Sequence, residues 1–236
     1  MGAIFLIRHA QASFGAADYD QLSDLGLTQS RVLGQALQVR GPRSDRVFCG
    51  TLRRHTQTAE GCLQAMGLPL QWDSDPDWNE YHHDDVLHVF DPRFRDPAVM
   101  AAELAAADNP RRRFQEIFVQ SMDRWVGGEH DGEYRESWSA FRARIERALT
   151  RVSASLGKSQ GALVFTSGGP IAVACALLLN LRPQDALRLN TRLANAAVTK
   201  LVCSGPALQS IQLSTVNEHA HFEVTERAGP ALITYR

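Results

Sequence analysis

The sequence has almost no net charge and no apolar run long enough to cross a membrane. Lysine and arginine number 25 against 26 aspartates and glutamates, which gives a net charge of −1 at pH 7. Nothing in this balance draws the chain to nucleic acid or to a membrane surface, so any attraction for anions must be local. The longest apolar stretch, IAVACALLLNL, is about half a membrane span. The opening MGAIFLIRHAQ lacks the positive region of a signal peptide. We therefore expect a cytoplasmic protein that binds neither nucleic acid nor membranes.

Cysteine is also scarce, and its spacing excludes two classes of small domain. The four cysteines are far apart in the chain, and no C-x-x-C pair occurs. A disulfide framework or a zinc ribbon is therefore not expected, and the pattern is typical of a reducing compartment. Three of the four lie in apolar segments, which predicts buried thiols. The cysteines are Cys49, Cys62, Cys175 and Cys203.

What the sequence does contain is an alternation of short apolar runs with helical patterns. The 236 residues, 44% of them hydrophobic, suit one large domain or two small ones. Thr28 is the expected N-cap of the first helix. Strands that alternate with helices predict a largely parallel sheet with helices on both faces, a three-layer α/β/α sandwich. The predicted strands are 3–7, 46–50, 68–72, 162–166, 196–203 and 208–215, and the predicted helices include 28–40, 52–66, 137–156 and one that starts at Pro170.

The middle of the chain has a different pattern. Asp96-Pro97 and Pro110 each have the form of a helix start, and VGGEHDGEYRE forms a polar loop. These features predict a helical cap inserted at about 82–135. We expect a single domain over 1–236 that carries this insertion.

Charged and small residues follow several predicted strands, at the point where each strand ends. Arg8 and His9 follow the first strand, Arg54 lies just after the second, and Glu80 comes after the third. The turn TSGG at 166–169 follows the fourth predicted strand. Ligands of open parallel sheets bind outside the carboxyl ends of the strands. The sequence therefore predicts that these segments converge on one site.

The residue types at this site favour phosphate. Arg8 and Arg54 offer planar forks of donors with permanent charge. The turn at 166–169 opens a helix, whose free N–H groups and positive dipole end attract anions. A like charge disfavours imidazolium, so His9 between two cations is held near neutrality and can attack phosphorus. Glu80 could donate a proton to a leaving oxygen if burial raises its pKa.

The same segments resemble the histidine phosphatase superfamily, which includes cofactor-dependent phosphoglycerate mutase. FLIRHAQASF looks like its RHG signature, and DYDQLSDLGLTQSRVLG resembles the continuation D-x-LT-x-x-G-x-x-QA. TLRRHTQTAE resembles the block S-x-L-x-R-A-x-Q-T-A, which places the family's second arginine at Arg54 and not at Arg53. DWNEYHHDD resembles the loop that carries the acid, with Glu80 at the proton-donor position. GALVFTSGGPIA resembles the strand and turn that usually read V-V-S-H-G-G. ESWSAFRARIERAL and NAAVTKLV also stand where the family has similar segments, so the resemblance spans nearly the whole chain in the right order.

This resemblance implies a phosphoglycerate mutase-like fold and a phosphoryl transfer that needs no metal or cofactor. His9 would attack phosphorus and form a phosphohistidine. Glu80 would protonate the departing alcohol and would then act as base while water releases phosphate. Arg8 and Arg54 would hold the phosphoryl oxygens as charge develops, with Ser167 and Gly168 as further phosphate contacts.

The sequence departs from the family pattern at three positions. Ala10 replaces the usual glycine, and Gly15 stands where mutases carry an asparagine that contacts phosphate. Ser167 aligns with the family's second histidine. A hydroxyl can donate one hydrogen bond to a phosphoryl oxygen, but it adds no positive charge. His221 or His82 is a candidate to fill that gap in space.

We predict a phosphomonoester hydrolase that acts on a small phosphorylated substrate. One alternative is a phosphoglycerate mutase-type transfer, and another is a catalytically weak member that only binds phosphate or a phosphopeptide. A metal hydrolase built on YHHDD (81–85) and NEHAH (217–221) is a third, although adjacent residues rarely face the same ion. The basic run PRRRF could bind a polyanionic substrate or simply be a solvated helix start. A homodimer through exposed strand edges is compatible with the sequence, which does not decide it.

Overall fold

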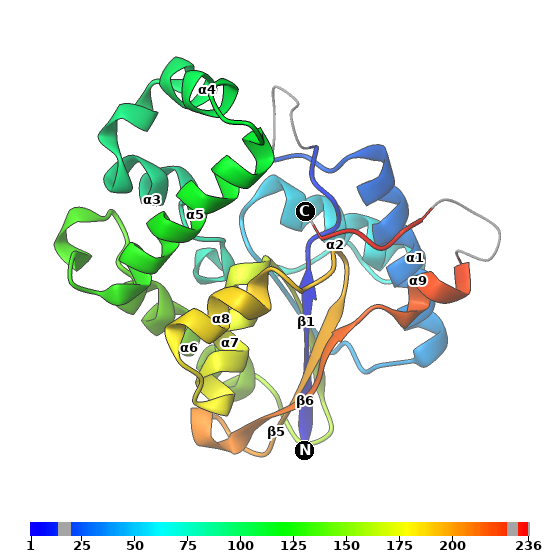
Figure 1. Cartoon of the computed structure of the whole chain (residues 1–236). Coiled ribbons are helices and arrows are strands. Elements are labelled where there is room, and N and C mark those ends of the chain that lie inside the picture. Colours follow the sequence, from blue (N-terminus) through cyan, green and yellow to red (C-terminus); the bar gives the residue numbers. More distant parts are fainter. Residues whose placement is uncertain (14–19, 226–230, 236) are drawn as a thin grey trace. The chain divides into compact units, whose positions relative to one another are not determined.

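A computed structural model of the chain describes residues 1–13, 20–225 and 231–235. Within these residues, six strands form one sheet in the order β3-β2-β4-β1-β5-β6. Three of them, β1, β5 and β6, are labelled where they lie side by side in Figure 1. The strands are β1 (Gly2–Arg8), β2 (Arg46–Cys49), β3 (Asp73–Ser74), β4 (Gly161–Thr166), β5 (Val198–Cys203) and β6 (Ile211–Glu218).

One part of the sheet is parallel and the other is antiparallel. β1, β4, β2 and β3 run in the same direction, whereas β5 runs against β1 and β6 runs against β5. β4 is buried along its whole length, as expected for a parallel strand covered on both faces. The register pairs Arg8 of β1 with Thr166 of β4. The carboxyl ends of these strands therefore lie together, and we call this side of the sheet the carboxyl edge.

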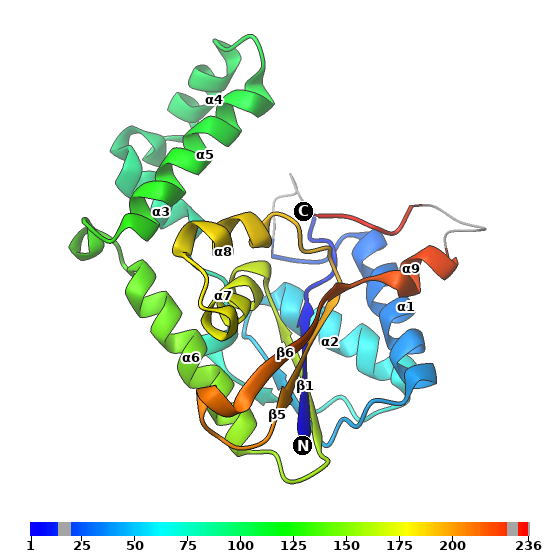
Figure 2. The same ribbon diagram turned by 60° about the horizontal axis from the view of Figure 1, so that its bottom comes forward.

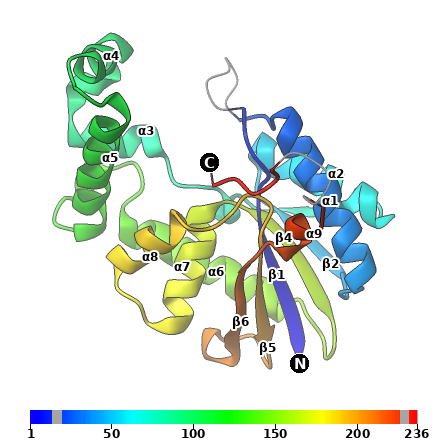
Figure 3. The same ribbon diagram turned by 45° about the vertical axis from the view of Figure 1, so that its right-hand side comes forward.

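Helices cover both faces of the sheet (Figures 2 and 3). α1 (Asp24–Arg40), α2 (Arg53–Met66) and α9 (Ala220–Thr225) pack on one face. α7 (Gly168–Leu179) and α8 (Pro183–Asn190) pack on the other, together with the part of α6 (Trp138–Ala154) that begins at Ile145. In the described segments, no helix combines the length and the apolarity that a membrane crossing requires.

A hydrophobic core fills the space between the sheet and the pair α1–α2. Ile7 of β1 and Phe165 of β4 face Leu33 of α1 and Leu63 of α2 in this core, and all four are fully buried. Close packing of this kind resists even small changes of volume. The ends of β1 and β4 therefore rest on a rigid base.

The described chain divides into two compact units, one of 1–80 with 145–236 and one of 81–144. The second unit contains α3 (His83–Phe90), α4 (Pro97–Ala105), α5 (Pro110–Gly127) and the start of α6 (Trp138–Ala154). Its aromatic side chains cluster, with ring centroids 5.0 Å apart for Tyr81–Trp125 and 5.2 Å apart for Trp125–Trp138. The sequence predicts the insertion at about 82–135. The second unit of the structure extends further at its C-terminal end, to residue 144.

The basic side chains at the start of α5 are paired within this second unit. Arg112 Nε lies 3.0 Å from Glu116 Oε1, and Arg113 Nη2 lies 2.6 Å from Glu103 Oε1. Both pairs are partly exposed, so each adds little to stability. These pairs nevertheless neutralise two arginines of PRRRF, the run that could bind a polyanionic substrate according to the sequence.

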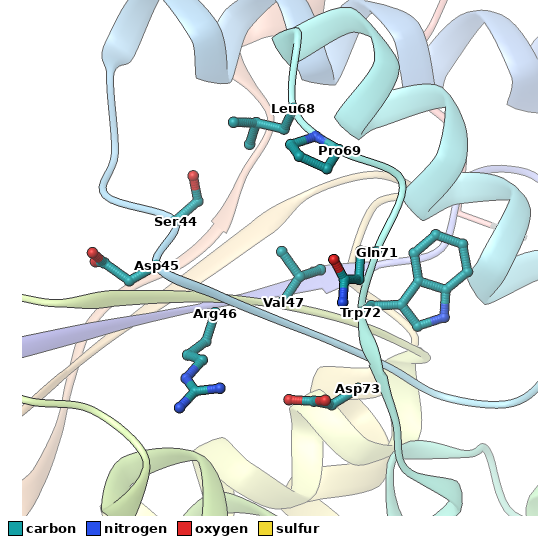
Figure 4. Close-up of a pocket in the computed structure, with 9 residues that line it drawn as sticks. All are labelled: Ser44, Asp45, Arg46, Val47, Leu68, Pro69, Gln71, Trp72 and Asp73. Atoms are coloured by element: carbon teal, nitrogen blue, oxygen red, sulfur yellow. The ribbon is translucent and has the colours of Figure 1, made fainter.

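The segment 68–72 is not the strand that its apolar residues predict. After Gly67 ends α2 in the left-handed conformation, Leu68 N donates back to Leu63 O and Gln71 N donates to Pro69 O. These local bonds replace a strand ladder, so β3 is delayed to Asp73–Ser74 and is short. The segment lines a cavity of about 300 Å³ beside the first residues of β2 (Figure 4).

The first helix begins earlier than its sequence pattern predicts. Ser23, not Thr28, is the N-cap of α1, and its Oγ accepts from Gly26 N at 3.0 Å. Thr28 lies inside the helix, where its Oγ1 donates to Asp24 O. Asp24 in the first turn also suits the positive end of the helix dipole.

Candidate active site

His9 lies at the carboxyl edge, and its backbone is held from both sides. His9 N donates to Thr166 O at 2.8 Å. His9 O accepts from Asn195 Nδ2 and from Ala196 N, each at 3.2 Å. The residue directly after β1 is therefore fixed between β4 and the segment that leads into β5.

The orientation of the His9 ring determines which nitrogen is available for chemistry. His9 Nδ1 lies 2.7 Å from Ala10 O, and a carbonyl oxygen can only accept. Nδ1 therefore carries the hydrogen, and Nε2 carries a lone pair. The side chain is 5% exposed. Burial holds the pKa of His9 well below 6.5, with further lowering by the charges of Arg54 and Arg8, so the ring is neutral at pH 7.

α2 places Arg54 beside this imidazole. Arg54 is buried, whereas Arg53 is exposed on the same turn. Arg54 Nη1 forms an ion pair with Asp20 Oδ1 at 2.6 Å, and Asp20 Oδ2 accepts from Arg53 N at 2.8 Å. Thr58 Oγ1, one turn further along, accepts from Ala10 N at 3.0 Å and donates to Arg54 O at 2.6 Å. The helix and the segment after β1 are thus bonded together at the site.

The turn between β4 and α7 brings bare backbone close to Arg8. A Cβ at Gly168 would lie 2.2 Å from Asn190 Oδ1 and 3.5 Å from Arg8 Nε, so a larger residue would have to displace the Asn190 side chain. Arg8 Nη1 donates to Leu193 O and, at 3.5 Å, to Tyr235 O. Arg8 is therefore held between the start of α7 and two backbone carbonyls.

Glu80 reaches the same end of α7 from the loop after β3. Its Oε2 accepts from Gly169 N at 3.1 Å. The loop is anchored nearby, because Thr166 Oγ1 donates to Trp78 O at 2.5 Å and Asn79 Oδ1 accepts from Thr51 N at 2.7 Å. The structure therefore brings six residues that the sequence predicts for the site to one edge of the sheet. They are Arg8, His9, Arg54, Glu80, Ser167 and Gly168.

The sequence reasoning missed one residue of this site, His55. Its Nε2 lies 2.6 Å from Ser167 Oγ, and both side chains are fully buried. Burial, and then the charge of Arg54, hold the pKa of His55 well below 6.5. The signal was present in the quoted block R-A-x-Q-T-A, where this chain has histidine in place of alanine.

The two histidines considered for the gap at Ser167 belong to different units. His221 is influenced by Arg40 and His219, and burial, followed by these two charges, lowers its pKa to about 4. His82 stands at the N-cap position of α3 in the second unit, and its side chain makes no capping bond. Gly15, the third departure from the family pattern, lies outside the described residues.

The His/Asp clusters have local partners. In 81–85, His83 Nε2 lies 3.2 Å from Asp84 Oδ1, and Asp85 Oδ2 accepts from Arg135 N. In 217–221, His219 Nδ1 lies 3.6 Å from Glu223 Oε1. Among the residues that the structure describes, no three His, Cys, Asp or Glu side chains form a group that could hold a metal ion.

Comparison with known families agrees with this geometry. The model of the histidine phosphatase superfamily (branch 1) matches residues 4–88 and 85–215. The chain belongs to this superfamily. The membership confirms the family and the enzyme class expected from the sequence, a phosphatase of the histidine phosphatase superfamily. No curated protein matches the chain.

Solved structures of similar fold cover nearly the whole chain. A putative alpha-ribazole-5'-P phosphatase from Escherichia coli is 20% identical, with a TM-score of 0.62 over 92% of this chain and 98% of that one. A mycobacterial glucosyl-3-phosphoglycerate phosphatase is 22% identical, with a TM-score of 0.57 over 91% and 98%. Phosphoglycerate mutase from Bacillus anthracis is 17% identical, with a TM-score of 0.63 over 93% and 94%. At these identities the likeness establishes the fold, and it confirms the expected phosphoglycerate mutase-like α/β class.

Proposed function

We propose that this chain hydrolyses small phosphomonoesters through a phosphohistidine formed on His9. The observation that carries the proposal is the state of the His9 ring. It is neutral, its Nδ1 hydrogen is committed to Ala10 O, and its Nε2 lone pair is free for attack. Arg8 and Arg54 lie close enough that their charges lower its pKa. An oriented, neutral nucleophile between two permanent cations is suited to a phosphate dianion.

The first chemical step transfers the phosphoryl group to the protein. His9 Nε2 forms a bond to phosphorus while the bond from phosphorus to the ester oxygen breaks. Glu80 gives its proton to that oxygen, so the alcohol leaves neutral. The guanidinium groups of Arg8 and Arg54 and the amides at the start of α7 stabilise the charge on the phosphoryl oxygens.

The second step returns the protein to its starting state. Water attacks the phosphorus of the phosphohistidine and gives a proton to the Glu80 carboxylate. The N–P bond breaks, His9 regains its lone pair, and inorganic phosphate leaves. The proton that Glu80 gives in the first step leaves with the alcohol, and a proton from the attacking water replaces it in the second.

The solved relatives support a small substrate. Their names refer to an alpha-ribazole phosphate, a glucosyl phosphoglycerate and phosphoglycerate, all of them small phosphate compounds. A small phosphorylated metabolite is accordingly the partner proposed for this chain. A cytoplasmic location, the lack of a nucleic-acid or membrane partner and the homodimer stay predictions.

A quench experiment tests the nucleophile. The protein is mixed rapidly with a ³²P-labelled phosphomonoester, and aliquots are stopped in acid or in base. A phosphoramidate survives base and is lost in acid, so we expect protein-bound label only after the base quench. His9→Ala should give no label and a fall in kcat of at least about 10³-fold. His130→Asn, which removes a histidine of the other unit, is the control and should label normally.

Two outcomes would contradict the proposal. Label that survives acid would point to an ester of serine or threonine. Efficient isomerisation of 3-phosphoglycerate in the presence of bisphosphoglycerate would instead show a mutase, which must keep water away from the phosphoenzyme.

A further inference from the structure

A second imidazole lies at the carboxyl edge and has no part in the steps above. The His55 ring is 5.8 Å from the His9 ring, centroid to centroid. Its Nε2 is 2.6 Å from Ser167 Oγ. Ser167 is the N-cap of α7, yet its side chain makes no capping bond to the helix. The Ser167 hydroxyl is engaged with His55 instead.

His55 and Ser167 are also two departures from the quoted motifs, and they touch each other. The block R-A-x-Q-T-A has alanine where this chain has His55, and V-V-S-H-G-G has histidine where this chain has Ser167. In the motifs, the small residue lies on α2 and the imidazole lies in the turn after β4. In this chain, the imidazole lies on α2 and the small residue lies in the turn. An imidazole is present beside position 167 although position 167 carries none.

The hydrogens of the pair determine what it can do. A neutral imidazole has one N–H and one acceptor nitrogen. Within the described residues, the buried His55 Nδ1 has no hydrogen-bond partner. A hydrogen on Nδ1 would be a buried, unpaired donor, and such groups are rare. The hydrogen is therefore placed on Nε2, which donates it to Ser167 Oγ, so the hydroxyl hydrogen of Ser167 is free for another acceptor.

We propose that His55 is a positioning residue that directs the hydroxyl of Ser167 toward a phosphoryl oxygen of the substrate. The inference rests on the proposed function. Ser167 is well placed for this, because it follows Thr166, whose carbonyl oxygen binds His9 N at 2.8 Å. The hydroxyl supplies the donor, and His55 fixes its direction, so the pair does jointly what neither side chain does alone.

The packing around His55 preserves this arrangement. A Cβ at Gly50 would lie 2.2 Å from His55 Nδ1 and 2.9 Å from Asn79 Oδ1, closer than side chains approach each other. Gly50 directly follows β2 and thus leaves the space that the ring occupies. Ser167 therefore contacts one nitrogen of the ring, and Gly50 lies against the other.

Steady-state kinetics on p-nitrophenyl phosphate test the inference. His55→Ala should lower kcat by about 10- to 100-fold, as the loss of a residue that orients an active-site group does. Ser167→Ala should lower kcat by about 100-fold, as the loss of one transition-state donor does. The double variant should be no slower than Ser167→Ala alone, because the two residues act as a unit. His55→Gln, whose amide N–H reaches the place of Nε2, should keep more activity than His55→Ala.

Controls separate this role from a structural one. Cys62→Ala truncates another fully buried side chain of α2 and should keep the wild-type kcat. If His55→Ala does not fold, His55→Gln with and without Ser167→Ala gives the same comparison. Equal kcat in wild type and His55→Ala would overturn the inference, as would losses that multiply in the double variant.

The proposed function can fail separately. A wild type that turns over no phosphomonoester removes the proposed function, and the inference with it. Loss of turnover in His9→Ala together with full turnover in His55→Ala removes only the inference. Acid-stable label that vanishes in Ser167→Ala would make Ser167 a nucleophile with His55 as its base, which overturns both.

Discussion

His9 and His55 are two buried imidazoles within one site, and both are neutral at pH 7. Burial is the main cause in each case, and the charge of Arg54 acts on both. For His9, neutrality is what makes the ring a nucleophile. The same property lowers the free energy of unfolding in acid, because the folded chain cannot take up protons that the unfolded chain accepts.

We expect the free energy of unfolding to fall as the pH is lowered below about 6.5. The folded-state pKa values of His9 and His55 lie below 6.5, so below that pH the unfolded chain binds more protons and is favoured. Each such histidine contributes a slope of about 1.4 kcal/mol per pH unit. His221, whose pKa is lowered to about 4, adds a third down to that pH. Above pH 6.5 these groups are neutral in both states, and the slope disappears.

Urea unfolding at pH 7.5, 6.5 and 5.5 measures this dependence. Between pH 6.5 and 5.5, His55→Gln should reduce the slope of the unfolding free energy against pH by the contribution of one histidine, about 1.4 kcal/mol per pH unit. Cys62→Ala removes a thiol whose pKa is raised to about 12, and thus no group that titrates in this range, so it should leave the slope unchanged. An identical slope in wild type and His55→Gln would show that His55 is not held neutral by the fold.

Among the helices, α1 shows most clearly how local chemistry sets an element's limits. Ser23 satisfies an amide of the first turn, and Gly41 ends the helix in the left-handed conformation. We expect Ser23→Ala to lower the free energy of unfolding by about 1 kcal/mol, because Gly26 N loses its acceptor. Thr28→Ala is the matched control. Since Thr28 lies within the helix, its loss should change stability by less than about 0.5 kcal/mol. Thermal or urea unfolding distinguishes the two, and a larger effect at Thr28 would assign the cap to that residue.

The strands at the centre of the sheet were predictable because burial on both faces demands continuous apolar runs. The run at 3–7 became β1 and the run at 162–166 became β4 with changes of only a residue at the ends. The strand predicted at 68–72 does not form, because Gly67 and Pro69 take part in local turns. The apolar content of the segment gives no sign of these turns. His55 could not be placed from the sequence, because its contact with Ser167 joins residues far apart in the chain. A histidine in an otherwise familiar block was the one available sign.

The folded chain as a whole keeps all four thiols away from solvent. The cysteines are free and buried. Burial raises the pKa of Cys49, Cys62 and Cys175 to about 12, so few thiolates exist at neutral pH. The sequence predicted buried thiols at three of the four cysteines, those in apolar segments. In the structure, the fourth is buried as well.

We expect the native protein to resist a thiol-reactive disulfide reagent at pH 7.5 for many minutes, and four thiols to react once it is unfolded in guanidinium. The rate should follow unfolding, because the thiolate is the reactive form and it is scarce in the folded state. Absorbance of the released reagent measures the count. Rapid reaction of one equivalent before unfolding would show that one of the four sites opens in the native state.

The contact between positions 55 and 167 restricts how such a protein can evolve. Histidine at both positions would place two rings in a volume that now holds one ring and a hydroxyl. A comparison that reads position 167 alone would class this chain as lacking an imidazole, although His55 places one 2.6 Å from Ser167 Oγ.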